Sequence, residues 1–139
     1  MMTKGKVFVD TVAWLALLNR QDRWHVAAQD VLRDLQREER QMVTSEFVLL
    51  EVADALAAPV WRQQTVSFLT GLRRTPLLEI VGGTAELWQR GWRLYGERLD
   101  KGWGLTDCSS FVIMEQEEIG IAFTADRHFQ QAGFEVLLL

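Results

Sequence analysis

Hydrophobic and polar positions along the chain form two kinds of segment, one typical of buried strands and one typical of amphipathic helices. Short apolar runs bounded by turn residues indicate strands, whereas apolar residues spaced three and four apart indicate helices with one buried face. Residues 24–39 follow the helical spacing, with apolar side chains at positions 24, 27, 28, 31, 32 and 35 and a charged opposite face. Residues 6–10 follow the strand pattern, and this run ends in an acid, Asp10.

The same patterns, punctuated by Pro59 and by the Gly82-Gly83 pair, predict alternating strands and helices along the whole chain. Such alternation implies a mostly parallel sheet covered by helices on both faces. We therefore expect an α/β fold, a three-layer α/β/α sandwich, with residues 1–139 forming a single domain. The expected strands are 6–10, 41–44, 77–81, 120–124 and 134–138, and the expected helices are 11–19, 24–39, 45–56, 60–73, 85–99 and 106–116.

The composition supports one soluble domain. The chain has 139 residues, 48% of them hydrophobic, which excludes a disordered chain and fits the usual size of about 100–200 residues per domain. Its single cysteine, Cys108, can form neither an internal disulfide nor a cysteine zinc cage, so a reducing cytoplasm is expected. No apolar stretch reaches the ~18 residues of a membrane span, and the first apolar run is too short for a signal peptide.

The net charge of −4 narrows the classes of nucleic-acid protein that the chain can represent. A protein that grips nucleic acid only by neutralising phosphates is expected to be basic. A metal-dependent nuclease is not restricted in this way, because its metal ligands add acids and the metal supplies local positive charge.

Three aspartates stand where parallel strands end or helices begin. Asp10 ends the first strand, Asp126 follows the fourth, and Asp107 opens the helix that precedes the fourth strand. Each one alone is an ordinary helix cap, a dipole-compensating acid or a turn residue. Thr11, next to Asp10, also has a position suited to capping, or to orienting a water at a metal.

Glu51 is a fourth candidate, on different grounds. Its helix reads Phe47-Val48-Leu49-Leu50-Glu51-Val52, so apolar residues surround the carboxylate in sequence. Burying an ionised carboxylate is costly unless a cation or a partner compensates it. A metal ion is the expected compensation, and a buried salt bridge to an arginine is the alternative.

The predicted topology directs all four acids to one crevice, because ligands of open parallel sheets bind beyond the carboxyl ends of the strands. Two carboxylates ~4 Å apart repel each other by about 4 kcal/mol at an effective dielectric constant of 20, so a cation is needed to hold several together. The candidate ligands are all oxygens, which favours Mg²⁺, with Mn²⁺ as a substitute, over zinc.

These residues lie in four blocks that resemble PIN-domain ribonucleases, and the chain is most similar to the VapC-like toxins of prokaryotic toxin–antitoxin pairs. The resemblance covers essentially the whole chain, although residues 59–99 match only in the order of elements. The four blocks are Val7–Thr11, Thr44–Val52, Leu105–Phe111 and Phe123–Phe129 followed by Gly133-Phe134.

The resemblance implies a five-stranded parallel sheet and an Mg²⁺-dependent endoribonuclease that forms a homodimer and binds an antitoxin. It maps the catalytic and metal-binding acids of the family to Asp10, Glu51, Asp107 and Asp126, and the hydroxyl near the last acid to Thr124. Asp10 and Asp107 are the expected central ligands, and the other two acids complete the set directly or through water. Hydrolysis by in-line attack of water would leave a 5′-phosphate and a 3′-hydroxyl.

Basic side chains must contact the RNA, because the acids cannot. The candidates are Arg127 and His128, which flank Asp126, and Arg20 and Arg23 in the loop after the first helix. Arginine commonly pairs with phosphate, although a solvated surface position is the simpler account of each residue taken singly.

Two other functions remain open from the sequence alone. A phosphatase that uses an aspartate nucleophile generally needs a second acid two residues after the first, and Val12 stands at that position. A non-catalytic PIN-like interaction module fits the acidic net charge but not four intact acids. Trp61, Trp88 and Trp92 could serve an oligomer or antitoxin surface, although core packing is the simpler account of most tryptophans.

Overall fold

Five parallel strands form one sheet in the order β3-β2-β1-β4-β5 in the computed structural model, which describes residues 5–139. The central strand β1 pairs with β2 on one side, where Phe8 lies opposite Val43, and with β4 on the other, where Val9 lies opposite Phe123. The mostly parallel five-stranded sheet is therefore confirmed. The strands are β1 (Val7–Val9), β2 (Met42–Ser45), β3 (Leu78–Val81), β4 (Ile121–Phe123) and β5 (Glu135–Val136).

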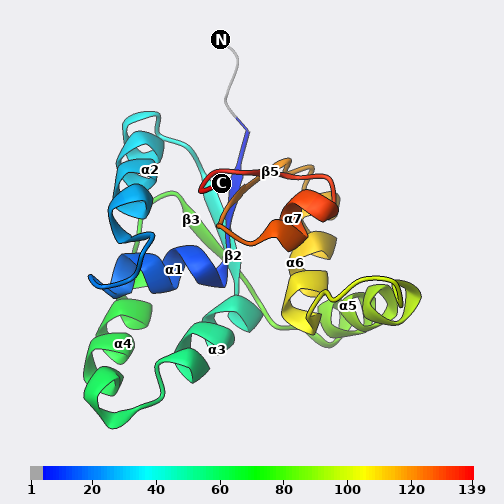
Figure 1. The fold of residues 1–139 in the computed structure, drawn as a ribbon, viewed down its shortest axis with the longest axis horizontal. Coiled ribbons are helices and arrows are strands. Elements are labelled where there is room, and N and C mark those ends of the chain that lie inside the picture. The colour runs from blue at the N-terminus through cyan, green and yellow to red at the C-terminus, as the bar shows by residue number, and fades with distance from the viewer. Residues whose placement is uncertain (1–4) are drawn as a thin grey trace.

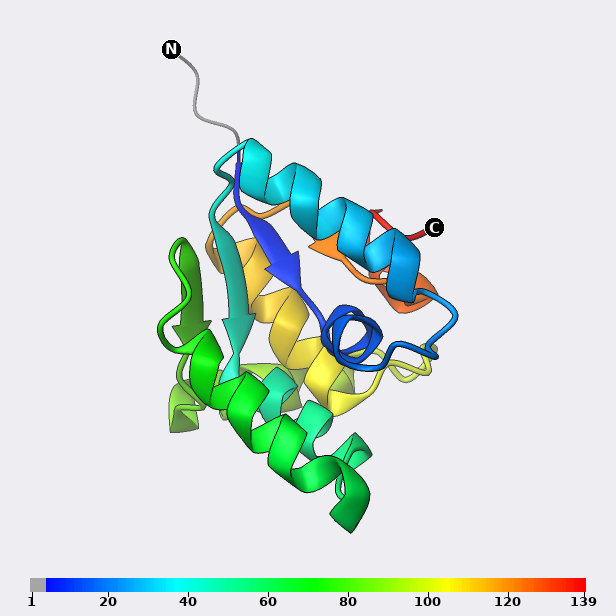
Figure 2. The ribbon, with the colours of Figure 1, turned by 90° about the vertical axis from the view of Figure 1, so that its left-hand side faces the viewer.

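Helices cover both faces of this sheet, which confirms the three-layer arrangement. Helices α1, α2 and α4 lie on one face, and α6 and α7 lie on the other, with α5 packed against α6 (Figures 1 and 2). Helix α3 contacts both α1 and α6. The helices are α1 (Thr11–Leu18), α2 (His25–Arg37), α3 (Glu46–Ala55), α4 (Pro59–Leu72), α5 (Ala85–Glu97), α6 (Leu105–Gln116) and α7 (Arg127–Gln131).

The core lies between the central strands and the helices on either side. All three residues of β1 are fully buried, as expected for a parallel strand covered on both faces. Phe8, Phe123 and Phe129 are the largest side chains completely removed from solvent, and they come from β1, β4 and α7. These apolar side chains fix the ends of β1 and β4 next to each other. Among residues 5–139, no helix is both long and apolar enough to cross a bilayer.

Two local features differ from the sequence prediction. The sequence prediction lacks the five-residue helix α7, because a helix this short shows no hydrophobic periodicity. The sequence feature that marks its start is the capping residue Asp126, whose Oδ1 accepts a hydrogen bond from the backbone N–H of His128 at 2.9 Å. Helix α6 begins at Leu105 with Gly104 as its N-cap, so Thr106 lies within the first turn and is not the cap. The expected helix 106–116 thus begins one residue earlier than predicted, whereas Ser45, the first residue of the expected helix 45–56, is the N-cap of α3.

The six tryptophans divide between core and surface. Trp14 and Trp103 are buried and Trp24 and Trp61 are half-buried, as core packing predicts. Trp88 and Trp92, however, are 49% and 56% exposed, so core packing is the wrong account of these two side chains. The buried face of α5 instead contains Leu87 and Gly91, and a Cβ added to Gly91 would lie 3.3 Å from the backbone N and Cα of Ser109 on α6. Glycine thus allows the close approach of α5 and α6.

Candidate functional site

The sheet reverses its strand order at β1, and the crevice at this reversal lies between the carboxyl ends of β1 and β4. Asp10 follows β1 and Asp126 follows β4, so they stand on the two sides of the crevice. Thr44 fixes the end of β1: its Oγ1 donates to the carbonyl oxygen of Val9 at 2.9 Å and accepts from Trp14 Nε1 at 3.1 Å. A buried polar network therefore holds the backbone immediately before Asp10.

Asp10 is a buried carboxylic acid, only 2% exposed. It occupies the N-cap position of α1 but makes no side-chain capping bond, so capping does not account for it. Its Oδ2 accepts a hydrogen bond of 2.8 Å from Thr124 Oγ1. Burial raises the pKa of Asp10 to about 7; hydrogen bonds from Thr124 and the Thr11 backbone oppose the rise, and the charges of Asp107 and Asp126 add to it.

Thr124 connects the acids of the two strands. While its hydroxyl donates to Asp10, the same Oγ1 accepts from the backbone N–H of Asp126 at 3.1 Å. Thr124 is completely buried, so this bridge is fixed by the core around it. The hydroxyl that the family resemblance singled out is thus in direct contact with Asp10.

Asp107 completes the acidic group from the N-terminal turn of α6. Its Oδ2 accepts from the backbone N–H of Gly104 at 3.1 Å and lies 2.9 Å from Nδ1 of His128. Burial raises the pKa of Asp107, the hydrogen bond from His128 lowers it, and the charge of Asp126 raises it further. The same imidazole nitrogen lies 3.4 Å from Asp126 Oδ1.

Asp107, Asp126 and His128 each place one oxygen or nitrogen atom within 4.8 Å of the others, an arrangement that can hold a metal ion. Asp10 stands beside this set, joined to it through Thr124 and close enough for its pKa to respond to both aspartates. Among the residues that the structure describes, no lysine or arginine pairs with any of these three acids. The carboxylates therefore gather without a permanent cationic side chain.

The family model of the PIN domain matches residues 7–135, a span that includes strands β1 to β4, the start of β5 and all three of these acids. The chain belongs to the PIN domain family.

This PIN domain has relatives of nearly the same length. The "23S rRNA-specific endonuclease VapC20" of Mycobacterium tuberculosis is 27% identical over 128 residues, which span 92% of this chain and 95% of VapC20. The crystal structure of that VapC20, described as a "Sarcin-Ricin loop cleaving toxin", superposes with a TM-score of 0.79 at 26% identity and the same coverage.

Two further solved structures share the fold of this PIN domain at lower identity. One is VapBC2 from Rickettsia felis bound to a promoter DNA fragment, with a TM-score of 0.68, 18% identity and coverage of 94% of this chain and 96% of that one. The other is FitAcB from Neisseria gonorrhoeae, with a TM-score of 0.63, 20% identity and coverage of 94% and 95%. At these identities the similarity shows only that the fold is shared.

Glu51 of this PIN domain is exposed, so the expectation that it is buried is wrong. Its apolar neighbours in sequence do not cover it, because α3 itself exposes Leu50, 59% accessible to solvent. Within residues 5–139, Glu51 forms no ion pair with an arginine, so the alternative of a buried salt bridge is not found either. Glu51 also lies outside the group formed by Asp107, Asp126 and His128. Burial of Glu51 therefore gives no reason to expect a cation.

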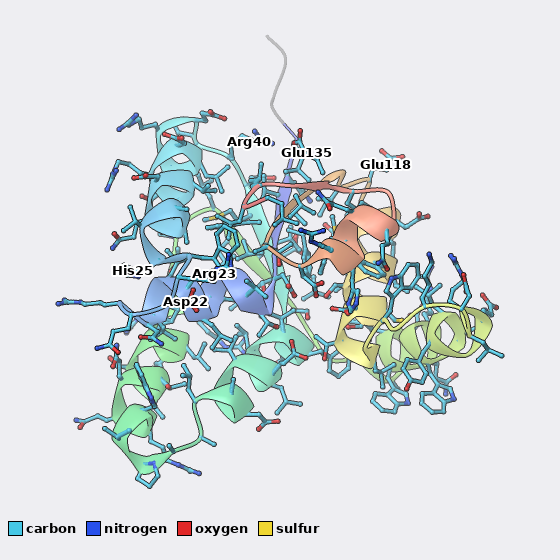
Figure 3. The ribbon with its side chains drawn as sticks, in the orientation of Figure 1. Asp22, Arg23, His25, Arg40, Glu118 and Glu135 are labelled. Carbon is cyan, nitrogen blue, oxygen red and sulfur yellow. The ribbon has the colours of Figure 1, made fainter. Side chains whose placement is uncertain are left out.

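The remaining predicted residues are one buried threonine and three exposed arginines. Thr11 is buried beside Asp10, and its Oγ1 has no hydrogen-bond partner among the described residues. Arg20, Arg23 and Arg127 are exposed; the guanidinium of Arg23 lies 4.8 Å from the ring centre of Trp24, on the loop between α1 and α2 (Figure 3). Their solvated surface positions are confirmed, and substrate contact stays a prediction.

His128 occupies a different place from the one expected. It is half-buried, and its ring faces Asp107 and Asp126, whereas the sequence suggested a contact with substrate at the surface. The signal in the sequence is the spacing Asp126-x-His128, because an aspartate that caps a helix brings the second residue of that helix next to its own carboxylate. Acids at the opposite ends of the strands, such as Glu118 before β4 and Glu135 at the start of β5, take no part in this group (Figure 3).

Proposed function

We propose that this protein is a divalent-cation-dependent endoribonuclease and the toxin of a VapBC-type toxin–antitoxin pair. The observation that carries the proposal is the convergence of Asp10, Asp107 and Asp126 at one crevice with no lysine or arginine paired to them within residues 5–139. Membership of the PIN domain family and similarity to an endonuclease over almost the whole chain support it.

The residues present fit a divalent cation. The proposed donors are the carboxylate oxygens of the three aspartates, a set suited to Mg²⁺ or Mn²⁺, and no lysine or arginine within residues 5–139 compensates ionised Asp10 in its buried position. The unpartnered hydroxyl of Thr11 beside Asp10 is suited to a water of the hydration shell. We propose Mg²⁺ as the natural cofactor, with Mn²⁺ as a substitute.

When bound, the cation supplies Lewis-acid chemistry: it polarises the phosphodiester, lowers the pKa of a water and stabilises the charge on the leaving oxygen. Asp10 and Asp107 are the central ligands in this proposal, and Asp126 adds a third carboxylate. Thr124 holds Asp10 in one orientation through its hydrogen bond of 2.8 Å. Glu51, exposed on α3, contributes through water in this proposal.

The substrate in this proposal is ribosomal RNA. The relative VapC20 is named for 23S rRNA and for the sarcin–ricin loop, and the two chains align over nearly their full lengths. The exposed guanidinium groups of Arg20, Arg23 and Arg127 are available to pair with phosphates. A protein with a negative net charge needs such local positive charge to bind RNA. His128, directed at the acids, is removed from this set of RNA contacts. An RNA substrate and a single unpaired cysteine both fit a cytoplasmic protein.

Two protein partners belong to the proposal. The fold is shared with chains solved as VapBC2 and FitAcB assemblies, which supports an antitoxin that occludes the site. A homodimer is supported by an exposed aromatic stripe on α5, in which the rings of Trp88, Trp92 and Tyr95 stack with centroids 6.2 and 5.6 Å apart. Tyr95 is 45% exposed, and exposed Leu50 of α3 lines the same shallow pocket as Trp88, so it adds to this apolar surface. Exposed apolar patches of this kind mark interaction surfaces.

The alternative functions have less support. Membership of the PIN domain family argues against a phosphatase of the aspartate-nucleophile type, as does Val12 at the position of its second acid. Burial and the neighbouring Asp107 raise the pKa of the Cys108 thiol to about 11, so a thiolate nucleophile is disfavoured as well. A non-catalytic interaction module predicts no cleavage under any metal condition.

The test is incubation of the purified protein with ribosomes and with protein-free 23S rRNA in Mg²⁺, followed by mapping of the cleaved ends. The proposal predicts discrete cuts with 5′-phosphate and 3′-hydroxyl ends that disappear with EDTA. Cuts in the sarcin–ricin loop would support the ribosomal substrate, and cuts in other RNA only would reject that substrate while keeping the ribonuclease. No cleavage of any RNA in Mg²⁺ or Mn²⁺ would favour the interaction module.

A further inference from the structure

His128 stands within the acidic group and has no role in an acid-only metal centre. Its Nδ1 lies 2.9 Å from Asp107 Oδ2 and 3.4 Å from Asp126 Oδ1, so one nitrogen approaches both carboxylates. The three side chains come from α6, from the end of β4 and from α7.

The two distances from this nitrogen match those between neighbouring ligands on one metal ion. Ligands of an octahedral cation lie about 2.1 Å from the metal, so adjacent ligands lie about 3.0 Å from each other. The two distances from Nδ1, 2.9 and 3.4 Å, lie close to this value. A cation bound to both aspartates would therefore have the imidazole nitrogen beside it.

The ring of His128 is held in this position by its surroundings. Its backbone N–H donates to Asp126 Oδ1 at 2.9 Å, which fixes the first turn of α7 to the acid. The next residue, Phe129, is completely buried and packs edge-on against Phe111 of α6, with ring centres 4.9 Å apart. Helix α7 is thereby anchored to α6, the helix that bears Asp107.

We propose that His128 is a metal ligand through Nδ1, together with Asp107 and Asp126, and that this nitrogen biases the centre toward Mn²⁺ over Mg²⁺. Mg²⁺ is a hard cation that takes oxygen ligands, whereas divalent first-row metals accept imidazole more readily. The inference rests on the proposed function to the extent that it assumes a cation between the aspartates. The competing account is a hydrogen bond only, in which the imidazole N–H donates to the carboxylates and never contacts a metal.

The chain has two histidines, which makes a direct spectroscopic test possible. The other one, His25, lies at the start of α2 on the opposite face of the sheet (Figures 1 and 3), and its Nδ1 is 2.7 Å from the carbonyl oxygen of Ala16. His25→Gln is therefore a matched control that removes an imidazole without approaching the acids.

The experiment is pulsed electron paramagnetic resonance of Mn²⁺ added to the full-length protein. The wild type is expected to show the modulation of one directly bound ¹⁴N, and ¹⁵N-histidine labelling should convert it to the ¹⁵N pattern without any mutation. The modulation should persist in His25→Gln and vanish in His128→Gln, while His128→Gln still binds Mn²⁺. Calorimetry should show the preference for Mn²⁺ over Mg²⁺ reduced by about tenfold or more in His128→Gln.

Two results would overturn the ligand assignment while leaving the proposed ribonuclease intact. One is bound Mn²⁺ without nitrogen modulation in the wild type, which would establish the hydrogen-bond-only account. The other is a modulation that survives in His128→Gln. A wild-type protein that binds no Mn²⁺ at all would overturn both the assignment and the metal centre of the proposed function.

Discussion

Asp10 is a carboxyl group that folding has removed from water without supplying a cation from the described part of the chain. Within residues 5–139, its side-chain hydrogen bond comes from the hydroxyl of Thr124, and the two charged groups that raise its pKa, Asp107 and Asp126, have its own sign. In the metal-free protein the charged form of Asp10 is thus unfavourable, which is the physical meaning of a pKa of about 7. A divalent cation reverses this balance, because it binds the ionised form.

Stability of the metal-free protein should therefore depend on pH through Asp10. Between about pH 4 and pH 7 the folded protein retains a proton on Asp10 that the unfolded chain has released, so the free energy of unfolding falls as pH rises through this range. Asp10→Asn, which is neutral at every pH, should lack this component and should be more stable than the wild type at pH 8 by on the order of 2 kcal/mol. Urea unfolding in EDTA at pH 5 and pH 8 measures both effects.

Added Mg²⁺ provides the control for this prediction. It should stabilise the wild type at pH 8, where Asp10 is ionised, and should have little effect on Asp10→Asn. Parallel stability profiles of the two proteins in EDTA would contradict the assigned state of Asp10.

At the scale of elements, the position of α5 depends on one glycine rather than on its aromatic side chains. A Cβ at Gly91 would contact the backbone of Ser109 at 3.3 Å, whereas a Cβ at Gly96 of the same helix would meet no atom within 4 Å. Helix α6, which carries Asp107, is therefore set directly against the backbone of α5.

The two glycines form a matched pair for mutation. Gly96→Ala should raise the free energy of unfolding by about 0.5–1 kcal/mol, because alanine favours helix. Gly91→Ala should fail to give this gain, since its methyl group must displace α6, and Gly91→Val should lose about 1–3 kcal/mol through overpacking. Thermal or urea unfolding compares the variants, and an equal gain from alanine at both positions would show that α5 and α6 are not in close contact.

The sequence predicted the strands, their parallel direction and the convergence of three aspartates more successfully than it predicted the faces of individual helices. Strand ends could be located because an apolar run must stop where an ionisable residue such as Asp10 follows it. Glu51 could not be placed in this way, since α3 leaves Leu50 exposed and apolar neighbours do not guarantee burial. The contact of His128 with Asp107 joins residues far apart in sequence, so no local pattern encodes it.

At the scale of the whole molecule, the exposed aromatic stripe of α5 is an apolar surface that the described part of the chain leaves open to solvent. Trp88, Trp92 and Tyr95 are each about half exposed, and Phe47 of α3 lies 6.4 Å from the ring of Trp88. Two copies that meet through this surface would cover the rings of both.

Trp92→Ala should weaken self-association without unfolding the protein. Loss of an aromatic anchor at an interface typically costs at least about 2 kcal/mol, or more than tenfold in the dimer dissociation constant. Analytical ultracentrifugation measures this change. As the control, Trp14→Ala in the core should lower the free energy of unfolding by about 3–5 kcal/mol, far more than Trp92→Ala. A monomeric wild type, or a Trp92→Ala dimer of unchanged affinity, would contradict the assignment of this surface.

The proposed ribonuclease depends on a cation that Asp10 and its neighbouring aspartates hold for cleavage of RNA. The most direct test is the initial rate of cleavage of one RNA over a series of Mg²⁺ concentrations, for the wild type, Asp10→Asn and Glu51→Gln. We predict a wild-type rate that rises to saturation with Mg²⁺ and vanishes in EDTA, and a loss of about 10³-fold in folded Asp10→Asn. Glu51→Gln, if the residue acts through water, should lose about 10–100-fold. Cleavage that persists in EDTA, or that Asp10→Asn performs at the wild-type rate, would contradict the account.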